Sequence, residues 1–220
     1  MTGLAAASSK TVTRIAREVL PTGSDRALNK FITEYNWDED ELNYERLEEL
    51  QNHGETRWSK DSYIVIDDSV LQRTGKELPG AGSFYDHNEG EPVWGQDLVY
   101  TFYVDHKTSY PLAFRQYEKA EDEDQEDEEA TKYELAKEII TELEEEIGMP
   151  TATYLFDSWF AHDSRLIKHV ESYGKDWVGP LRSNRQVMYD GEEKRVDALE
   201  ECIDTEEREI DDETYNIWTK

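Results

Sequence analysis

The chain is short of cysteine and of basic residues, and it has no long apolar run. Its single cysteine, Cys202, excludes an internal disulfide framework and a metal site built from clustered cysteines. A membrane-spanning helix needs about 20 consecutive apolar residues, and the sequence contains no such stretch. The N-terminal segment lacks the charged start and the apolar run of a signal peptide. We therefore expect a cytoplasmic protein with no membrane partner.

Acidic residues far outnumber basic ones. The 220 residues include 52 Asp and Glu against 24 Lys and Arg, which gives a formal net charge of -28. Aromatic residues make up 11% of the chain, enough to build a core, so acidic disorder is not expected. The carboxylates are spread along the whole chain, which is typical of a halophilic protein whose surface charges are screened by molar salt. An acidic partner for a basic protein is the alternative.

The first quarter of the chain is predicted to be helical. Apolar residues at helical spacing indicate two short helices between Ser9 and Thr33, and Ser24 or Asp25 is the expected cap of the second. A third, acidic helix is expected over Trp37–His53. Its inward-facing residues are predicted to be Leu42, Leu47 and Leu50.

Beyond this helical part the pattern changes to strands. The apolar, β-branched run Ser62–Ser69 predicts a buried strand that ends in two aspartates. Further strands are expected over Val93–Val104 and Tyr110–Tyr117. We interpret the glycine-rich stretch 74–90 as a loop and the acidic block 118–129 as a solvated insertion within the fold.

Helices and strands then alternate. The expected elements are a helix over Thr131–Ile147 closed by Gly148, a strand over Thr151–Phe156, a helix over His162–Tyr173, a strand-like return over Asp176–Leu181, and strands or a ragged acidic extension over 186–220. The order β-β-β-α-β-α-β requires a sheet that begins antiparallel and continues parallel. We therefore predict an α/β fold with a ribonuclease H-like mixed sheet and an N-terminal helical segment.

Two of the predicted central strands end in aspartate. One ends at Asp67, with Asp68 beside it, and the other ends at Asp157. Strand ends of α/β sheets gather ligands and catalytic groups, so neighbouring strands would bring these carboxylates together. Clustered carboxylates without His or Cys form a hard oxygen site suited to Mg²⁺ or Mn²⁺. In a chain with 52 acidic residues, a chance aspartate at a strand end is an equally good explanation.

The local sequence around these aspartates is more specific. The segment SYIVIDDSVLQRTGKELPGAGSFYDHNEG resembles the first catalytic segment of insertion-sequence DDE transposases, in which an apolar strand ending in D-D-T precedes a T-G-K turn and a G-x-x-x-Y-D-H loop. The segment TYLFDSWFAHDSRLIKHVESYGKDWVGPLRSNRQV resembles the second, with its D-S-W turn, helix, strand and final R/K-S-N-R. The resemblance, to the haloarchaeal type, runs from about Ala6 to the end of the chain.

This resemblance implies roles for individual residues. Asp67 is the implied first acid and Asp157 the second, both as ligands of Mg²⁺ or Mn²⁺, with Asp68 as the alternative to Asp67. Arg182 and Arg185 follow a strand near the same sheet edge and are predicted to contact DNA phosphates. Solvated surface arginines are the alternative.

The aromatic turn and the family loop are less specific. We expect the tight turn after Asp157, which contains Trp159 and Phe160, to fix the carboxylate. We interpret Trp159 as a core residue rather than as a base-stacking group. The pair Asp86–His87 matches the family loop, and a capping role is as plausible as a DNA contact.

One part of the family pattern is missing. The third acid of these transposases is a glutamate on a later helix, in a Tyr-x-x-Arg-Trp-x-Ile-Glu type of segment, and the sequence contains no such segment. We therefore expect a chain truncated at both ends and weakly active or inactive on its own. Residues 1–58 are predicted to be a helical segment with a possible DNA-binding role, and 59–220 a ribonuclease H-like catalytic domain without its C-terminal part.

The leading functional hypothesis is a DNA transposase that uses a divalent metal ion to cleave and join DNA at element ends. The alternative is a non-catalytic remnant that binds DNA or dimerises. In either case the expected partners are DNA and a second copy, of itself or of an intact transposase. A glycosidase with paired carboxylates is a third class, but we find no carbohydrate-stacking pattern to support it.

Overall fold

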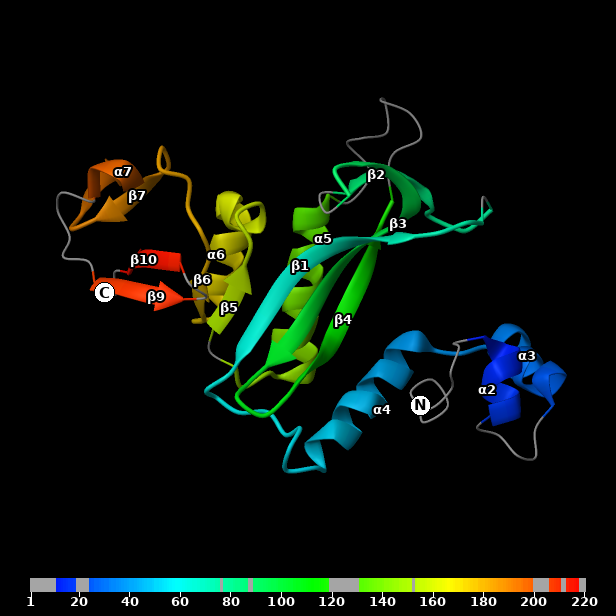
Figure 1. Ribbon diagram of the computed structural model, residues 1–220. Coiled ribbons are helices and arrows are strands. Elements are labelled where there is room, and N and C mark those ends of the chain that lie inside the picture. The colour runs from blue at the N-terminus through cyan, green and yellow to red at the C-terminus, as the bar shows by residue number, and fades with distance from the viewer. Residues whose placement is uncertain are drawn as a thin grey trace. The chain divides into compact units, whose positions relative to one another are not determined.

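The computed structural model describes residues 11–18, 24–75, 77–86, 89–118, 131–151, 153–199, 206–210 and 213–217. The chain divides into two compact units, residues 1–46 and 47–220 (Figure 1). Predictions that involve Cys202, His87 or most of the acidic block 118–129 lie outside the described residues. The boundary between the units falls within a helix, and the functional division at residue 58 stays a prediction.

The three predicted N-terminal helices are present among the described residues. They are α2 (Val12–Glu18), α3 (Asp25–Glu34) and α4 (Glu39–Gln51). Of the two candidate caps for α3, Ser24 takes the role, because its hydroxyl accepts a hydrogen bond from the Ala27 N–H at 3.1 Å.

The prediction that Leu42 faces inward is wrong. Its side chain is 44% exposed, whereas Leu47 is 2% exposed and belongs to the core of the second unit, with Leu50 packed against it. At 3.6 residues per turn, Leu42 lies about 140° around the helix from Leu47, so the two leucines cannot share one buried face.

A mixed sheet forms the centre of the second unit, as predicted. Its order is β2-β3-β1-β5-β6, and β4 pairs with β3. Strand β1 is antiparallel to β3 and parallel to β5. The sequence prediction missed one short strand, β2. The strands are β1 (Tyr63–Gln72), β2 (Gly82–Asp86), β3 (Glu91–Val104), β4 (Ser109–Tyr117), β5 (Thr153–Phe156) and β6 (Asp176–Val178).

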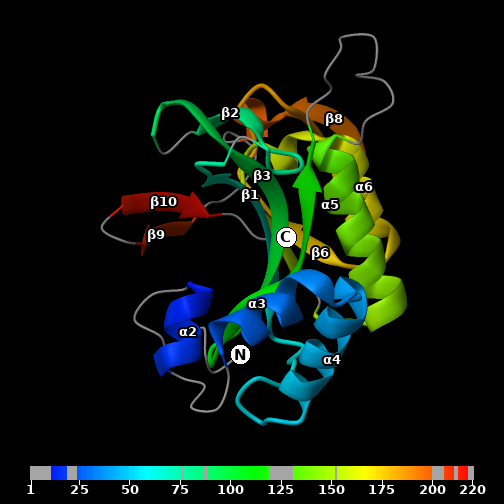
Figure 2. The same cartoon turned by 90° about the vertical axis from the view of Figure 1, so that its right-hand side faces the viewer.

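Helices cover one face of this sheet. Figure 2 shows α5 (Lys132–Thr141) and α6 (Ser164–Ser172) together on the same side. Thr131 caps α5 in a reciprocal capping box with Glu134, and a π-helical turn, η2 (Glu142–Ile147), continues it. Gly148 ends the helix at φ 69°, a left-handed conformation that glycine adopts without strain.

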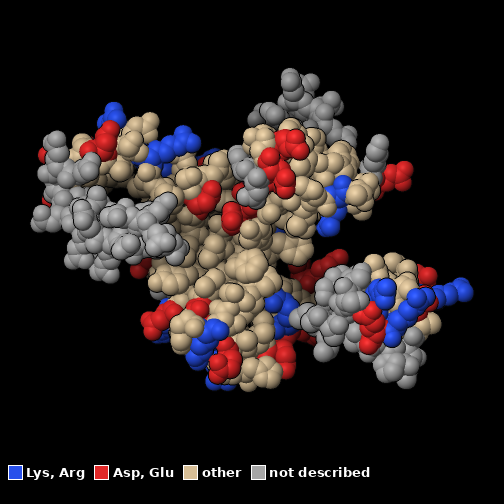
Figure 3. Space-filling model, in the orientation of Figure 1, with Lys and Arg blue, Asp and Glu red and all other residues tan. Residues whose placement is uncertain are grey.

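The two faces of the sheet differ in burial. Ile64 and Ile66 of β1 point to the helix-covered face and are at most 1% exposed. The opposite face carries Tyr63 and Phe114, which are 46% and 62% exposed. Figure 3 looks onto this opposite face and shows a broad uncharged area, with acidic and basic groups mainly around it. The core therefore lies on the helix side of the sheet.

The C-terminal part forms strands, the first of the two alternatives expected there. Two antiparallel strand pairs are present among the described residues there. Separately, no helix in the described part of the chain is long and apolar enough to cross a membrane. The elements are β7 (Gln186–Tyr189), β8 (Glu192–Arg195), α7 (Val196–Leu199), β9 (Glu206–Ile210) and β10 (Glu213–Ile217).

Candidate active site

The two adjacent aspartates of β1 point to opposite faces of the sheet. Side chains alternate along a strand, so Asp68 follows Ile64 and Ile66 on the helix-covered face. Asp67 lies on the other face, where the residue opposite it on β3 is Tyr100. The same strand thus carries one carboxylate towards the helices and one away from them.

Asp67 is held by hydrogen bonds on its own face. Its Oδ2 accepts from the Tyr100 hydroxyl at 3.3 Å, and its Oδ1 accepts from the Asp68 N–H at 2.9 Å. Burial raises the pKa of the Asp67 carboxyl, and the nearby charges of Asp68 and Asp157 also raise it. Burial, together with Asp67, raises the pKa of Tyr100 to about 12. Asp67 is therefore close enough to Asp157 to feel its charge.

Asp157 is fixed by the turn that follows β5. Its Oδ1 accepts hydrogen bonds from the backbone N–H groups of Trp159 at 3.0 Å and Phe160 at 2.9 Å. The short 3₁₀ helix η3 (Phe160–His162) starts at this point. The prediction of a tight turn that fixes the carboxylate is confirmed. Strand β5 lies in parallel beside β1, with Phe156 opposite Ile66, so Asp157 follows the end of β5 close to the level of Asp67 and Asp68. The prediction that the first strand ends in these two aspartates is wrong, because β1 continues to Gln72 in its pairing with β3.

Asp68 has a partner that the sequence prediction did not include. The Lys132 Nζ lies 2.5 Å from Asp68 Oδ2 and 2.6 Å from Asp97 Oδ2. Burial alone would lower the pKa of Lys132, but its hydrogen bonds to the two aspartates outweigh burial and raise it. Burial raises the pKa of Asp97, although Lys132 acts in the opposite direction. The result is a partly buried triad of two carboxylates and one ammonium group.

These groups open into one cavity of about 530 Å³. Its charged lining consists of Asp68, Asp97, Asp157, Lys132 and Arg182. Ser83, Phe84, Tyr85, Tyr117, Ser158 and Trp159 complete the described lining. Three carboxylates and two cations therefore line the same space.

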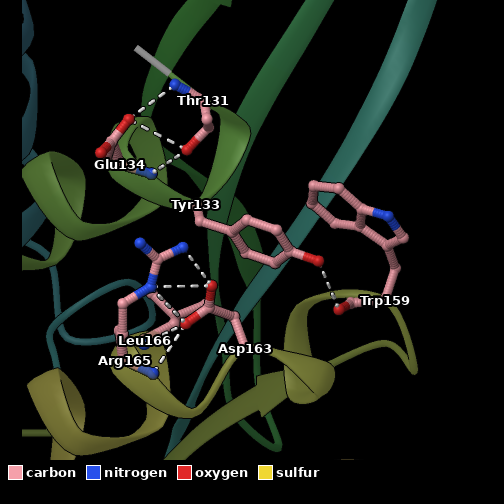
Figure 4. Close-up of polar contacts among 7 residues, drawn as sticks. All are labelled: Thr131, Tyr133, Glu134, Trp159, Asp163, Arg165 and Leu166. Carbon is pink, nitrogen blue, oxygen red and sulfur yellow. Dashed lines mark hydrogen bonds and ion pairs between the residues drawn. The ribbon is translucent and has the colours of Figure 1, made fainter. Parts of the chain in front are cut away.

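An aromatic pair borders this cavity. The rings of Tyr133 and Trp159 stack with centroids 4.1 Å apart, and the Tyr133 hydroxyl donates to the Trp159 carbonyl at 3.3 Å (Figure 4). Trp159 is 41% exposed, so the prediction that it is a core residue is wrong, and the fully buried aromatic is Phe160. Figure 4 also shows Asp163, whose carboxylate caps α6 through the N–H groups of Arg165 and Leu166.

The two predicted phosphate contacts lie in different environments. Arg182 lines the cavity. Arg185 donates to the Ala161 carbonyl at 2.5 Å and so ties the segment after β6 to the turn after β5. Asp86 accepts from the Glu89 N–H at 3.4 Å, which is a turn-capping contact. The structure brings Asp68, Asp157 and Arg182 together and places Asp67 and Arg185 outside the lining of the cavity.

A sequence comparison identifies the family. The pattern of the family described as DDE superfamily endonuclease matches residues 3–198. The chain belongs to this family.

Comparisons of this DDE endonuclease with solved structures and curated sequences are less informative. A solved structure entitled "Crystal structure of a pre-cleavage Mos1 transpososome" is similar to the chain at 10% identity and a TM-score of 0.26. The similarity covers 79% of this chain and 56% of the other, so the DDE endonuclease chain spans little more than half of that protein. No curated protein sequence matches the chain.

In this DDE endonuclease, sequence reasoning missed two charged residues that line the cavity. Asp97 lies on the same face of β3 as the buried Val99, Thr101 and Tyr103. This alternation would have predicted a buried acidic side chain at position 97. Lys132 stands in the first turn of α5, where the helix dipole disfavours a cation. That mismatch was the second signal.

The donor set fits a hard divalent ion in type. Asp68 and Asp157 offer carboxylate oxygens from neighbouring strands, and Mg²⁺ and Mn²⁺ prefer such ligands. The buried Oδ1 of Asp97 has no hydrogen-bond partner among the described residues. Within the described part of the chain, no group of three or more His, Cys, Asp or Glu side chains has the arrangement of a metal site. The described residues therefore supply carboxylates of a suitable type around one cavity, without an assembled metal site.

Proposed function

We propose that the chain is a transposase-type DNA endonuclease that cleaves and joins DNA at the ends of a mobile element with the help of Mg²⁺ or Mn²⁺. The observation that carries the proposal is that Asp68 and Asp157, from adjacent parallel strands, line one cavity together with Arg182. Membership of the DDE superfamily endonuclease family supports the reaction class. The path β4-β3-β1-β5-β6 supports a ribonuclease H-like catalytic domain.

The sequence assigns the first acid to Asp67, with Asp68 as the alternative, and we propose Asp68. Asp68 lines the cavity and lies on the same face as Lys132. Asp67 lies on the opposite face, where its two oxygens accept hydrogen bonds from the Tyr100 hydroxyl and the Asp68 N–H, and it is not among the described residues that line the cavity. A metal ligand that acts on a phosphate in the cavity must lie at the position of Asp68. Asp67 then contributes negative charge behind the site rather than a coordinating oxygen.

Four residues of the cavity then have proposed roles. Asp68 and Asp157 would hold the metal ion, which supplies activation of a water molecule or 3′-hydroxyl and neutralises charge at phosphorus. The turn after Asp157 orients its carboxylate through two N–H groups. Arg182 would donate to a phosphate oxygen of the DNA. The exposed face of Trp159 is available to an unpaired base.

The net charge of -28 opposes DNA binding at ordinary salt, because such binding usually gains from phosphate neutralisation and counterion release. In the molar salt of a halophilic cytoplasm this electrostatic contribution is largely screened. Local contacts such as Arg182, together with a metal ion between carboxylate and phosphate, would then carry the affinity. A second copy or an intact transposase remains the proposed protein partner.

A plasmid-nicking assay tests this function. The chain is incubated with supercoiled plasmid and Mn²⁺ in molar KCl, and D157N serves as the matched control. We expect metal-dependent nicking by the wild type that D157N does not show. Nicking that D157N retains, or that needs no metal, contradicts the proposal. DNA binding by both proteins without any nicking supports instead the non-catalytic remnant.

A further inference from the structure

Lys132 lies where a lysine is not expected from local rules. It is the first residue of α5, next to the capping residue Thr131, and the positive end of the helix dipole disfavours a cation there. Its side chain is nevertheless 18% exposed and points to Asp68 and Asp97. The two carboxylates therefore compensate for both the dipole and the burial.

Asp97 is buried at a cost. Its side chain is 4% exposed and forms an ion pair with Lys132, and its Oδ1 has no hydrogen-bond partner among the described residues. Burying a carboxylate with an unsatisfied oxygen costs free energy, and a buried ion pair is often no more stable than apolar residues of similar volume. Stability alone therefore does not explain the pair, which lies at the cavity that also contains Asp157.

The ammonium group competes directly for the proposed metal ligand. Lys132 binds Oδ2 of Asp68, a residue that lines the cavity, at 2.5 Å, so an ion bound to this oxygen must separate them. The ammonium would not be left without neighbours. Asp97 holds it at 2.6 Å, and the rings of Tyr117 and Trp159 lie 5.6 and 5.9 Å away. Cations interact favourably with aromatic rings at such distances.

We propose that Lys132, anchored by Asp97, is a tethered counter-ion that a divalent metal ion must displace from Asp68, so that this pair sets the metal affinity of the site. The inference rests on the proposed function, because it takes Asp68 and Asp157 as the metal ligands. Lys132 and Asp97 are positioning residues in this scheme. Without metal, the ammonium group holds Asp68 in place through their ion pair. With metal, it moves to Asp97 and the aromatic rings.

Opposite changes in metal affinity are expected from the two partners. Removing the competing ammonium in K132M should tighten Mn²⁺ binding, by roughly ten-fold on the scale of changes to groups around metal ligands. Because K132M leaves Asp97 buried without its cation, the double variant K132M/D97N provides a version without a stranded charge, and it should also bind more tightly. D97N alone frees Lys132 to pair with Asp68, so its Mn²⁺ binding should weaken.

The experiment is a Mn²⁺ titration of the DNA-free chain in molar KCl, with free Mn²⁺ followed by electron paramagnetic resonance and folding checked by circular dichroism. K168M removes an exposed lysine from α6 and controls for net charge. Tighter binding by K132M/D97N, with K168M unchanged, is the expected result. If D157N loses binding but K132M and the double variant bind like the wild type or more weakly, the inference is overturned and the metal site survives. If D157N binds like the wild type, the proposed metal site itself fails.

Discussion

The ring of Trp159 stacks on that of Tyr133, with centroids 4.1 Å apart and planes within 6° of parallel. This contact joins the first turn of α5 to the turn that fixes Asp157. Phe160 meets both rings edge-on, at 6.1 Å from Tyr133 and 4.9 Å from Trp159. The aromatic cluster therefore links the position of the second acid to the helix that carries Lys132.

Neighbouring aromatic residues of this cluster should have separable effects. F160A removes a side chain that is 0% exposed and should cost about 3–5 kcal/mol of unfolding free energy, as deletions of buried Phe do. W159A removes a side chain that is 41% exposed and should cost much less, but should weaken binding of single-stranded DNA by about 1–3 kcal/mol if a base stacks there. Chemical denaturation and fluorescence anisotropy measure the two effects. A large stability loss in W159A with unchanged DNA affinity would assign Trp159 a structural role only.

The two arginines should separate in the same way. R182A should weaken DNA binding by about 1.5–3 kcal/mol, the range for a hydrogen bond to a charged group, without changing the unfolding midpoint. R185A should lower the unfolding free energy by about 1–3 kcal/mol, because the Ala161 carbonyl loses its donor. Each variant is the control for the other, measured by anisotropy and by denaturation in molar KCl. Equal effects on DNA affinity would argue against the separate roles.

His169 should make stability depend on pH. Its Nε2 lies 3.0 Å from Thr141 Oγ1 and 3.2 Å from the Lys137 carbonyl oxygen, and burial lowers its pKa below the ordinary value of about 6.5. The unfolded chain then binds more protons than the folded one near that pH, so stability falls as pH drops through about 6.5. H169Q removes this contribution. Thermal unfolding at about pH 5 and about pH 7.5 should show a smaller loss for H169Q than for the wild type, and equal losses would refute the assignment.

Much of the fold could be predicted because it follows periodicity. The apolar run before Asp67 and the helical stripe ended by Gly148 gave the correct elements, since strand and helix periods differ strongly. Strand β2 was missed because only one of its five residues, Phe84, is a buried apolar residue. The segment therefore lacks the alternation of apolar and polar residues from which a strand is predicted. The prediction that Leu42 is buried was wrong because the apolar residues of α4 do not lie on one face of the helix.

The candidate site was predictable only in part. The motifs drew attention to Asp157 and the Asp67–Asp68 pair. Two adjacent acids on one strand point to opposite faces, and the sequence does not say which of them lines a cavity; the structure places Asp68 there. Asp97 and Lys132 are 35 positions apart in the numbering and meet only through tertiary packing. No local pattern in the sequence encodes that meeting.

The central claim is that Asp68 and Asp157, and not Asp67, bind the divalent ion. The direct test is Mn²⁺ binding by the wild type, D67N, D68N and D157N, measured by electron paramagnetic resonance in molar KCl. Each variant removes one negative charge and replaces a carboxylate by an amide of the same shape, so the three are matched. The account predicts that D68N and D157N lose binding while D67N retains it. Loss of binding in D67N with retention in D68N would contradict the account and return the first position to Asp67.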